Sequence, residues 1–479
     1  MDPILYWNEV ALEANRVSFT NGKKEQPGPT LSSRALAIVH LAMYDAYAGV
    51  RGNPVTPVVD LSAYIPGLPS PKPNASANAA VAAAARATLS SLYPSQKSFF
   101  DLKHTQAGLS GNGLQEGHEF GLLVAQKILD KRQDDPSASG DGYAASMAHG
   151  AHRPDPDNPG QGFHAPFYGA NSRCFAVTHR HELCDPPQPG SCEYINALKQ
   201  VQGKGIAPEL MGTLPAGISA RTANQTLIGI YWGYDGAAEL GTPPRLYNQI
   251  VRAVAIAQNN SVDRNARLFA LVNAAMGDAG VLAWDQKYIH DLWRPVVGIR
   301  ENDPSLGPLG TGNNVLSGDA DTGWLPLGAP NTNSTEKNGT PNFPAYPSGH
   351  ATFGAAALHI TRRFYEVTSR SNDTLFDGIT FVSDEFNGIN RDNKGTVRPK
   401  HVRSFPGGLW QMIVENGISR VFLGVHWVFD AFAENATGDP DLSQNIGGIP
   451  LGLKIADDIY DSGLNLSTVG PRNSNNLLY

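Results

Sequence analysis

Helical segments separated by Pro- and Gly-rich connections dominate this 479-residue sequence and limit its fold more than any other feature. Runs that alternate apolar and polar residues are few, and the 50 glycines and 35 prolines imply many long loops. The pattern therefore predicts an all-α protein with short strands at most. The expected helices cover residues 32–49, 78–92, 113–132, 223–233, 245–258, 264–278, 280–294, 350–366 and 408–422.

The loops indicate how these helices are grouped. No loop has the repetitive composition of an interdomain linker. We therefore expect one unit, 1–479, whose helix-rich halves, about 1–230 and 231–479, pack as two bundles and end in a polar, Asn-rich tail. The longest loops, rich in Pro, Gly, Asn and Asp, are 51–76, 133–172, 182–192 and 303–347.

Charge and hydropathy exclude two classes of partner. The net charge is −7 and no Lys/Arg-rich run is present, which argues against binding to nucleic acid. The first residues, MDPILYWNEVALEANRV, contain no apolar run of signal-peptide length, and no later segment approaches the roughly 18 apolar residues of a membrane span. We expect a soluble protein, and its secretion would have to proceed without a leader, unless this sequence lacks its signal peptide.

All three cysteines lie in one segment, at Cys174, Cys184 and Cys192, with His179 and His181 between them. This grouping invites a zinc site. The spacings of nine and then seven residues match no common zinc pattern, however, and DPPQPGSC is typical of a loop. One local disulfide or three free thiols is the favoured interpretation.

The first chemical motif is KYIHDLWRP, in which Lys287 and Arg294 are seven residues apart. If one helix carries both, they lie almost two turns apart on one side, and Pro295 ends or bends that helix. His290 would then border the same face. The alternative is a solvated basic stripe in which Asp291 pairs with one of the two cations.

The second motif is FPAYPSGHATFGAAALHI, where Ser348 and Gly349 precede a helix that begins near His350. Free N–H groups and the positive end of the helix dipole favour an oxyanion there, Gly349 allows close backbone approach and Ser348 can donate its hydroxyl. His350 is then placed for proton transfer. The alternative is a simple helix cap with an incidental histidine.

The third motif is ISRVFLGVHWVFD, where Arg420 precedes His426 and Gly424 breaks the helix between them. If a helix restarts at 426, Asp430 lies one turn from His426 and accepts a hydrogen bond from one ring nitrogen. The other nitrogen is then free to act as a metal ligand or a nucleophile. The alternative is a core histidine paired with an acid.

The three motifs occur in the order Lys-x6-Arg-Pro, Pro-Ser-Gly-His and Ser-Arg-x5-His-x3-Asp. Together they resemble the signature shared by vanadium-dependent haloperoxidases and the type 2 phosphatidic acid phosphatase superfamily. Vanadate and phosphate are both tetrahedral oxyanions, and Lys287, Arg294 and Arg420 supply the opposite charge. The motifs alone therefore leave three hypotheses: a haloperoxidase, an acid phosphatase that forms a phosphohistidine at His426, and a protein that only binds an anion.

Resemblance beyond the motifs favours the haloperoxidase. The chain is similar to fungal vanadium chloroperoxidases through ILYWNEVALEANRV, FHAPFYG, IYWGYDGAAELGTPPRLYNQIVR, EFNGINRD and IGGIPLGLKIAD. This resemblance implies two four-helix bundles, with vanadate at one end of the second. It also implies hydrogen peroxide and chloride or bromide, or both, as substrates, small organic acceptors of hypohalous acid, and a secreted protein. Cytoplasmic localisation is the alternative.

The resemblance also assigns roles to single residues. It places vanadate oxygens against the cations and Ser348–Gly349, the metal on His426, the polarisation of peroxide on Lys287, and acid–base work on His350. Asp235 would pair with Arg420, and Trp284 and Phe343 would form a dry halide pocket that favours chloride, because similar bromoperoxidases carry a histidine in place of Phe343. The vanadate ligands implied are Lys287, Arg294, Ser348, Gly349, Arg420 and His426.

Overall fold

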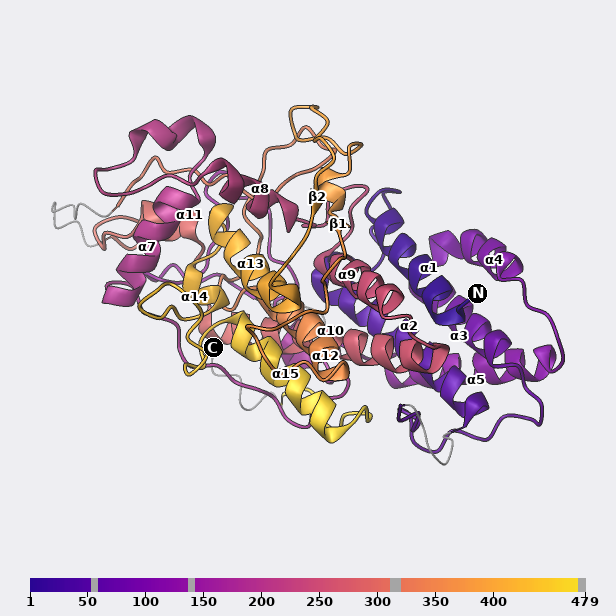
Figure 1. Cartoon of the computed structure of the whole chain (residues 1–479). Coiled ribbons are helices and arrows are strands. Elements are labelled where there is room, and N and C mark those ends of the chain that lie inside the picture. Colours follow the sequence, from indigo (N-terminus) through magenta and orange to yellow (C-terminus); the bar gives the residue numbers. More distant parts are fainter. Residues whose placement is uncertain (53–58, 137–142, 311–319, 473–479) are drawn as a thin grey trace.

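The computed structural model describes residues 1–52, 59–136, 143–310 and 320–472, and these are largely helical (Figure 1). The predicted all-α class is confirmed. The helices before residue 260 are α1 (Pro3–Ser18), α2 (Gly28–Arg51), α3 (Ala77–Leu92), η1 (Pro94–Gln96), α4 (Lys97–Gln106), α5 (Leu114–Lys131), α6 (Tyr168–Asn171), α7 (Cys192–Lys204), η2 (Pro208–Thr213), α8 (Ala223–Tyr231) and α9 (Pro243–Ala257).

The remaining helices include the longest one in the described chain. They are α10 (Val262–His290), α11 (Pro295–Arg300), α12 (Gly349–Phe364), η3 (Asp384–Phe386), α13 (Gly408–Phe422), α14 (Val428–Ala431) and α15 (Gly448–Ser462). The strands assigned in the described residues are β1 (Phe381–Val382) and β2 (Val402–Arg403), which pair antiparallel. Short strands at most were expected, and this is what the structure contains.

Helix α10 packs against two groups of helices. Helices α2, α3 and α5 pack on one another, and α2 also packs on α10. Helices α12, α13 and α15 form the second group, in which α12 and α15 also pack on α10. In Figure 1 the indigo-to-purple helices α1–α5 lie together at one end of the molecule, and α7, α11 and α14 lie at the other. The division into halves near residue 230 stays a prediction, since α10 contacts both groups.

The 29-residue α10 corrects one sequence expectation, because 264–278 and 280–294 were predicted as separate helices. The Gly and Asp residues around the expected break have packing roles. A Cβ at Gly277 would lie 2.7 Å from the Phe175 ring, and one at Gly280 would lie 2.7 Å from Ser33 Oγ of α2. The Asp278 carboxylate accepts the backbone N–H groups of 175–177 and so fastens that loop to the helix.

The end of α10 corrects a second expectation. The helix stops at His290, where Asp291 adopts a left-handed conformation with φ of 44°, and Pro295 begins α11 rather than bending α10. Lys287 and Arg294 therefore belong to different helices and do not share a helical face. Asp291 does not pair with either cation in the structure, since its carboxylate accepts the Tyr143 hydroxyl at 2.8 Å.

Helix α10 also passes a length-and-composition test for a membrane span, and it is the one helix among the described residues that does so. Its apolar stretch is entirely buried by other parts of the protein. A helix that is apolar on all sides and covered on all sides by protein is a core helix.

Several helices were missed from the sequence, namely α1, α4, α7 and α15. Helix α15 begins with two glycines and Pro450, residue types that are more common in loops than in helices. In the structure these glycines allow α15 to approach α12 closely. A Cβ at Gly448 would lie 2.5 Å from the Ser348 carbonyl oxygen, and one at Gly452 would lie 2.5 Å from that of Thr352.

We expect Gly452→Ala to lower the free energy of unfolding by about 1–3 kcal/mol, because its methyl group would press on the α12 backbone. In an exposed helix the same change would stabilise. Gly417→Ala in α13 is the matched control, since its Cβ would meet only side-chain atoms of Ala431 and Ile449 at 3.2 Å. Urea denaturation measures both variants, and equal losses would contradict the close α12–α15 contact as the cause.

Candidate active site

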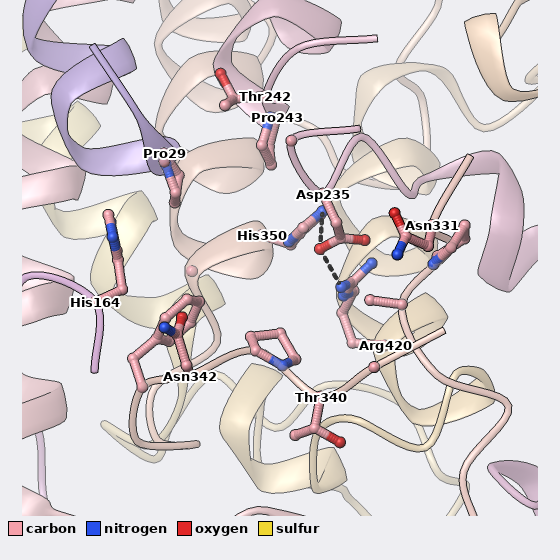
Figure 2. A pocket seen from close by; sticks show the side chains of 18 of the residues that line it. Pro29, His164, Asp235, Thr242, Pro243, Asn331, Thr340, Asn342, His350 and Arg420 are labelled. Atoms are coloured by element: carbon pink, nitrogen blue, oxygen red, sulfur yellow. Dashed lines mark hydrogen bonds and ion pairs between the residues drawn. The ribbon is translucent and has the colours of Figure 1, made fainter. Parts of the chain in front are cut away.

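The three sequence motifs meet at the N-terminus of α12. Helix α10 brings Lys287, the start of α11 brings Arg294, and the end of α13 brings Arg420. All three cationic side chains are buried, at 0%, 1% and 0% exposure respectively. A solvated basic stripe is therefore ruled out for the first motif. Arg420 lines a cavity of about 400 Å³, which Figure 2 shows from close by, whereas Lys287 and Arg294 are not among its lining residues and lie behind its wall.

Ser348 is the N-cap of α12, as the Pro-Ser-Gly-His pattern predicted. Its Oγ accepts the Ala351 N–H at a long 3.4 Å, and its own backbone N–H donates to the Asp430 carbonyl oxygen at 2.8 Å. Gly349 lines the cavity, and a Cβ there would lie 3.3 Å from the Trp284 ring. The first turn of α12 thus presents the positive end of the helix dipole at the cavity wall.

Arg420 forms the ion pair with Asp235 that the resemblance implied. The Arg420 Nη2 donates to Asp235 Oδ1 at 2.7 Å, and the second carboxylate oxygen has no hydrogen-bond partner. The Nε and Nη1 atoms of Arg420 are buried and also lack an acceptor. Figure 2 shows Asp235 between His350 and Arg420, where it can orient both.

Arg294 is fixed by three acceptors. Its Nε donates to the Phe343 carbonyl oxygen at 2.8 Å, and its Nη1 faces the Val425 carbonyl oxygen at 2.8 Å and His426 Nε2 at 2.9 Å. The Nη2 atom is buried without an acceptor. Burial lowers the pKa of this guanidinium to about 9, and the nearby Arg420 adds to the effect.

Three guanidinium nitrogens, two on Arg420 and one on Arg294, are therefore buried without an acceptor. Buried N–H groups nearly always have partners, so each one indicates an acceptor that belongs there. The planar edge of a guanidinium matches two oxygens of an oxyanion. Together with the α12 N-terminus, these donors fit a tetrahedral anion such as vanadate or phosphate.

His426 lies beside this donor set with a defined tautomer. Its Nδ1 is 2.7 Å from Asp430 Oδ2, which also accepts the Trp427 N–H at 3.0 Å. Because arginine only donates, the contact with Arg294 leaves the lone pair on Nε2. Burial and the positive charges of Arg294 and Lys287 lower the pKa of His426 well below its usual value. A neutral ring with an unprotonated Nε2, which here accepts from Arg294 Nη1, is what a metal ligand or nucleophile requires once that hydrogen bond gives way.

Lys287 directs its ammonium at the backbone before α12. Its Nζ donates to the carbonyl oxygens of Pro344, Ala345 and Pro347 at 2.9, 3.1 and 2.5 Å. The same Nζ lies 5.1 Å from the centre of the Phe343 ring. Burial, together with the charge of Arg294, lowers the pKa of Lys287 well below its usual range. In this structure the lysine organises the loop, and its contact with anion oxygens stays a prediction.

His350 lines the cavity from the first turn of α12. Its Nε2 is 2.7 Å from the Gly233 carbonyl oxygen and 4.0 Å from Asp235 Oδ1. The carbonyl accepts, so Nε2 carries the hydrogen and Nδ1 the lone pair. Burial and Arg420 lower the pKa of His350 to about 4, which keeps the ring neutral above that pH. The ring can therefore take up a proton.

An aromatic wall closes the side of the cavity near α10. The Trp284 and Phe343 ring centres are 4.8 Å apart, and both residues line the cavity as expected. His164 completes the wall, 5.9 Å from Trp284 and 6.0 Å from Phe343. Burial lowers its pKa to about 4. Sequence reasoning left His164 unassigned, although it lies in FHAPFYG, one of the stretches that carried the family resemblance.

Other candidates from the sequence lie elsewhere. His290 is not among the residues that line the cavity, and its Nδ1 is 3.3 Å from Asp185 Oδ1. The three cysteines are free, which agrees with one of the two favoured interpretations and not with a disulfide. No metal-ligating cluster in the described residues contains a cysteine.

Comparison with known proteins agrees with this geometry. Residues 1–161 match the family model of the vanadium chloroperoxidase N-terminal domain, and residues 267–440 match that of the VCPO second helical-bundle domain. The vanadium chloroperoxidase of Curvularia inaequalis is 35% identical over 569 aligned positions, which cover 96% of this chain and 90% of that protein.

Two solved structures share the fold. A bacterial vanadium-dependent iodoperoxidase aligns with a TM-score of 0.66 at 19% identity, over 95% of each chain. A bacterial vanadium-dependent chloroperoxidase in its holo form aligns with a TM-score of 0.60 at 17% identity, over 93% of this chain and 94% of that one. The near full-length identity to the Curvularia enzyme, the two matching domain models and the assembled pocket place this chain in the vanadium chloroperoxidase family.

Proposed function

We propose that this protein is a vanadate-dependent haloperoxidase that oxidises chloride or bromide, or both, with hydrogen peroxide to hypohalous acid. The observation that carries the proposal is the set of buried guanidinium N–H groups without acceptors, next to a histidine whose Nε2 is unprotonated. The family of the chain supports vanadate rather than phosphate as the resident anion.

The pocket residues would divide the work as follows. Arg294, Arg420, the Ser348 hydroxyl and the Gly349 amide would hold vanadate oxygens, and His426 Nε2 would bind the metal. When bound, vanadate supplies a Lewis-acid centre that activates peroxide towards a halide. Asp430 orients His426 by its 2.7 Å hydrogen bond and keeps Nε2 unprotonated.

Two further residues would serve the chemistry itself. His350 is neutral above a pH of about 4, so it can accept a proton from peroxide and return one to the product. Asp235, which pairs with Arg420 and lies 4.0 Å from His350, holds these two groups in a fixed relation. Lys287 adds positive charge beside the Phe343 ring and would polarise the peroxide.

The wider cavity supports small organic acceptors of hypohalous acid. Beyond the aromatic wall, its lining combines apolar residues such as Phe19 and Pro330 with polar ones that include Lys337. A cavity of about 400 Å³ has room for a small molecule near the site where hypohalous acid forms. The amides that line the cavity are Asn158, Gln161, Asn331 and Asn342.

We expect protein reconstituted with orthovanadate to brominate or chlorinate a phenolic dye when hydrogen peroxide and halide are present at mildly acidic pH. The measurement is the rate of dye halogenation with and without vanadate, alongside hydrolysis of a phosphate ester by the vanadate-free protein. Hydrolysis without halogenation would replace the proposal with an acid phosphatase that forms a phosphohistidine at His426.

His350→Ala serves as the internal control for this assay. We expect halogenation to fall by roughly 10²–10⁴-fold, since a positioned acid–base group contributes that much, while vanadate affinity is largely kept. An inert wild-type protein that still binds vanadate would favour a protein that only binds anions.

The aromatic wall leads to an expectation about halide choice. Phe343→His should lower kcat/KM for chloride relative to bromide by roughly 10-fold or more, because an imidazole brings water and hydrogen bonds to a dry surface. Phe343→Leu is the matched control, since it keeps the surface apolar. Steady-state rates with each halide give the ratio, and a ratio unchanged by the histidine would remove Phe343 from halide selection.

A further inference from the structure

Outside the cavity, three potential metal ligands lie together, and none of them is among the residues that line the active-site cavity. His179 and His181 come from the loop between α6 and α7, and Asp458 comes from α15. One donor atom from each residue lies within 4.8 Å of the other two. It is the one such cluster of His, Cys, Asp and Glu side chains in the described part of the chain.

We propose that His179, His181 and Asp458 bind one divalent transition-metal ion, with Zn²⁺ as the natural occupant, and that this ion fastens the loop to α15. The proposal concerns a structural ion and does not depend on the haloperoxidase activity. It also differs from the cysteine-containing zinc site that the grouping of the three cysteines invited, because no cysteine belongs to the cluster.

The distances fit a shared ion. His181 Nε2 is 3.0 Å and His179 Nδ1 is 3.7 Å from Asp458 Oδ2. Ligands about 2.0–2.1 Å from a tetrahedral zinc are about 3.3–3.4 Å from one another, so these two distances lie on either side of the required value. The His179 side chain is 64% exposed and can rotate to complete the geometry.

The surroundings hold the ligands in place. The Thr178 backbone N–H donates to Asp458 Oδ2 at 2.9 Å and the Thr178 hydroxyl donates to Oδ1 at 2.8 Å. This keeps the carboxylate turned towards the loop, as contacts around metal ligands commonly do. The two imidazole ring centres are only 4.1 Å apart. One ion can therefore contact both rings.

The donor set also selects the kind of ion. Two imidazole nitrogens and one carboxylate suit zinc, copper, nickel or cobalt and not calcium or magnesium, which prefer oxygen ligands. Because His179 is exposed, a water molecule can occupy the fourth position. The ion would take the place of the proton that now lies between His181 Nε2 and Asp458.

Binding would reach the rest of the fold through α15. This helix packs on α12, whose N-terminus forms part of the active site, and Gly448 of α15 faces the Ser348 carbonyl oxygen. On the other side, the loop is joined to α10 by the hydrogen bonds from 175–177 to Asp278. An ion at the cluster would thus link α10, the loop and α15, and stabilise the folded state by mass action.

Isothermal titration of chelator-treated full-length protein with Zn²⁺ alone tests the proposal. We expect one Zn²⁺ per chain and a higher melting temperature with the ion. Co²⁺ should give the visible absorption of a tetrahedral cobalt centre. The double variant His179→Asn/His181→Asn should weaken Zn²⁺ binding by roughly 10–100-fold or more and abolish the rise in melting temperature.

Further variants separate this cluster from other ligands. His426→Ala, in the active site, and Cys184→Ser/Cys192→Ser, which changes one cysteine of the same loop and the first residue of α7, should both retain the Zn²⁺ site. His401→Asn controls for the loss of a histidine elsewhere. His179→Asn alone changes an exposed side chain, so it also tests the site should the double variant fail to fold. Absence of stoichiometric Zn²⁺ binding, or binding that follows the cysteines or His426, would overturn the proposal.

Discussion

Three buried cations in one place form the constraint on which the rest of this structure depends. Lys287, Arg294 and Arg420 are each almost fully covered, and taking such charges out of water is costly unless they are compensated. The protein supplies two carboxylates, Asp235 and Asp430, and several backbone carbonyl oxygens. The guanidinium nitrogens left without acceptors fit a further partner, the oxyanion of the proposed function.

Three packed helices, α10, α12 and α15, position this cluster of charges. Helix α10 contacts both groups of helices and delivers Trp284 and Lys287 near its C-terminal end. Helix α12 adds its N-terminus. The glycines of α15 allow α15 to pack closely against the first turn of α12. Rigid helices rather than flexible loops therefore fix most of the donors, so the pocket is organised before the anion binds. Such preorganisation reduces the cost of stabilising charge during a reaction.

Sequence reasoning predicted the all-α class and several contacts of the pocket, but not the helix boundaries that bring the pocket residues together. The pairs Arg420–Asp235 and His426–Asp430, and the cap at Ser348, form in the structure as expected because each depends on a short motif or a close family resemblance. The argument that placed Lys287 and Arg294 on one helical face was wrong, since Asp291 ends α10 between them. Their convergence comes from tertiary packing, which local periodicity cannot encode.

Other features were beyond sequence reasoning for similar reasons. The glycines of α10 and α15 resemble helix breaks until the neighbouring helix is in view, and His164 becomes an active-site residue only once its loop packs against Trp284. The cluster of His179, His181 and Asp458 joins distant parts of the sequence, since His181 and Asp458 are 277 residues apart. Such long-range pairs carry no local pattern.

A crystal structure of the protein soaked with orthovanadate tests the central claim most directly. The account predicts a tetrahedral or trigonal-bipyramidal density bonded to His426 Nε2, with its oxygens on the Arg294 and Arg420 nitrogens that now lack acceptors and on the first turn of α12. Vanadate bound elsewhere, or a pocket that stays empty at saturating vanadate while these nitrogens remain unpaired, would contradict it.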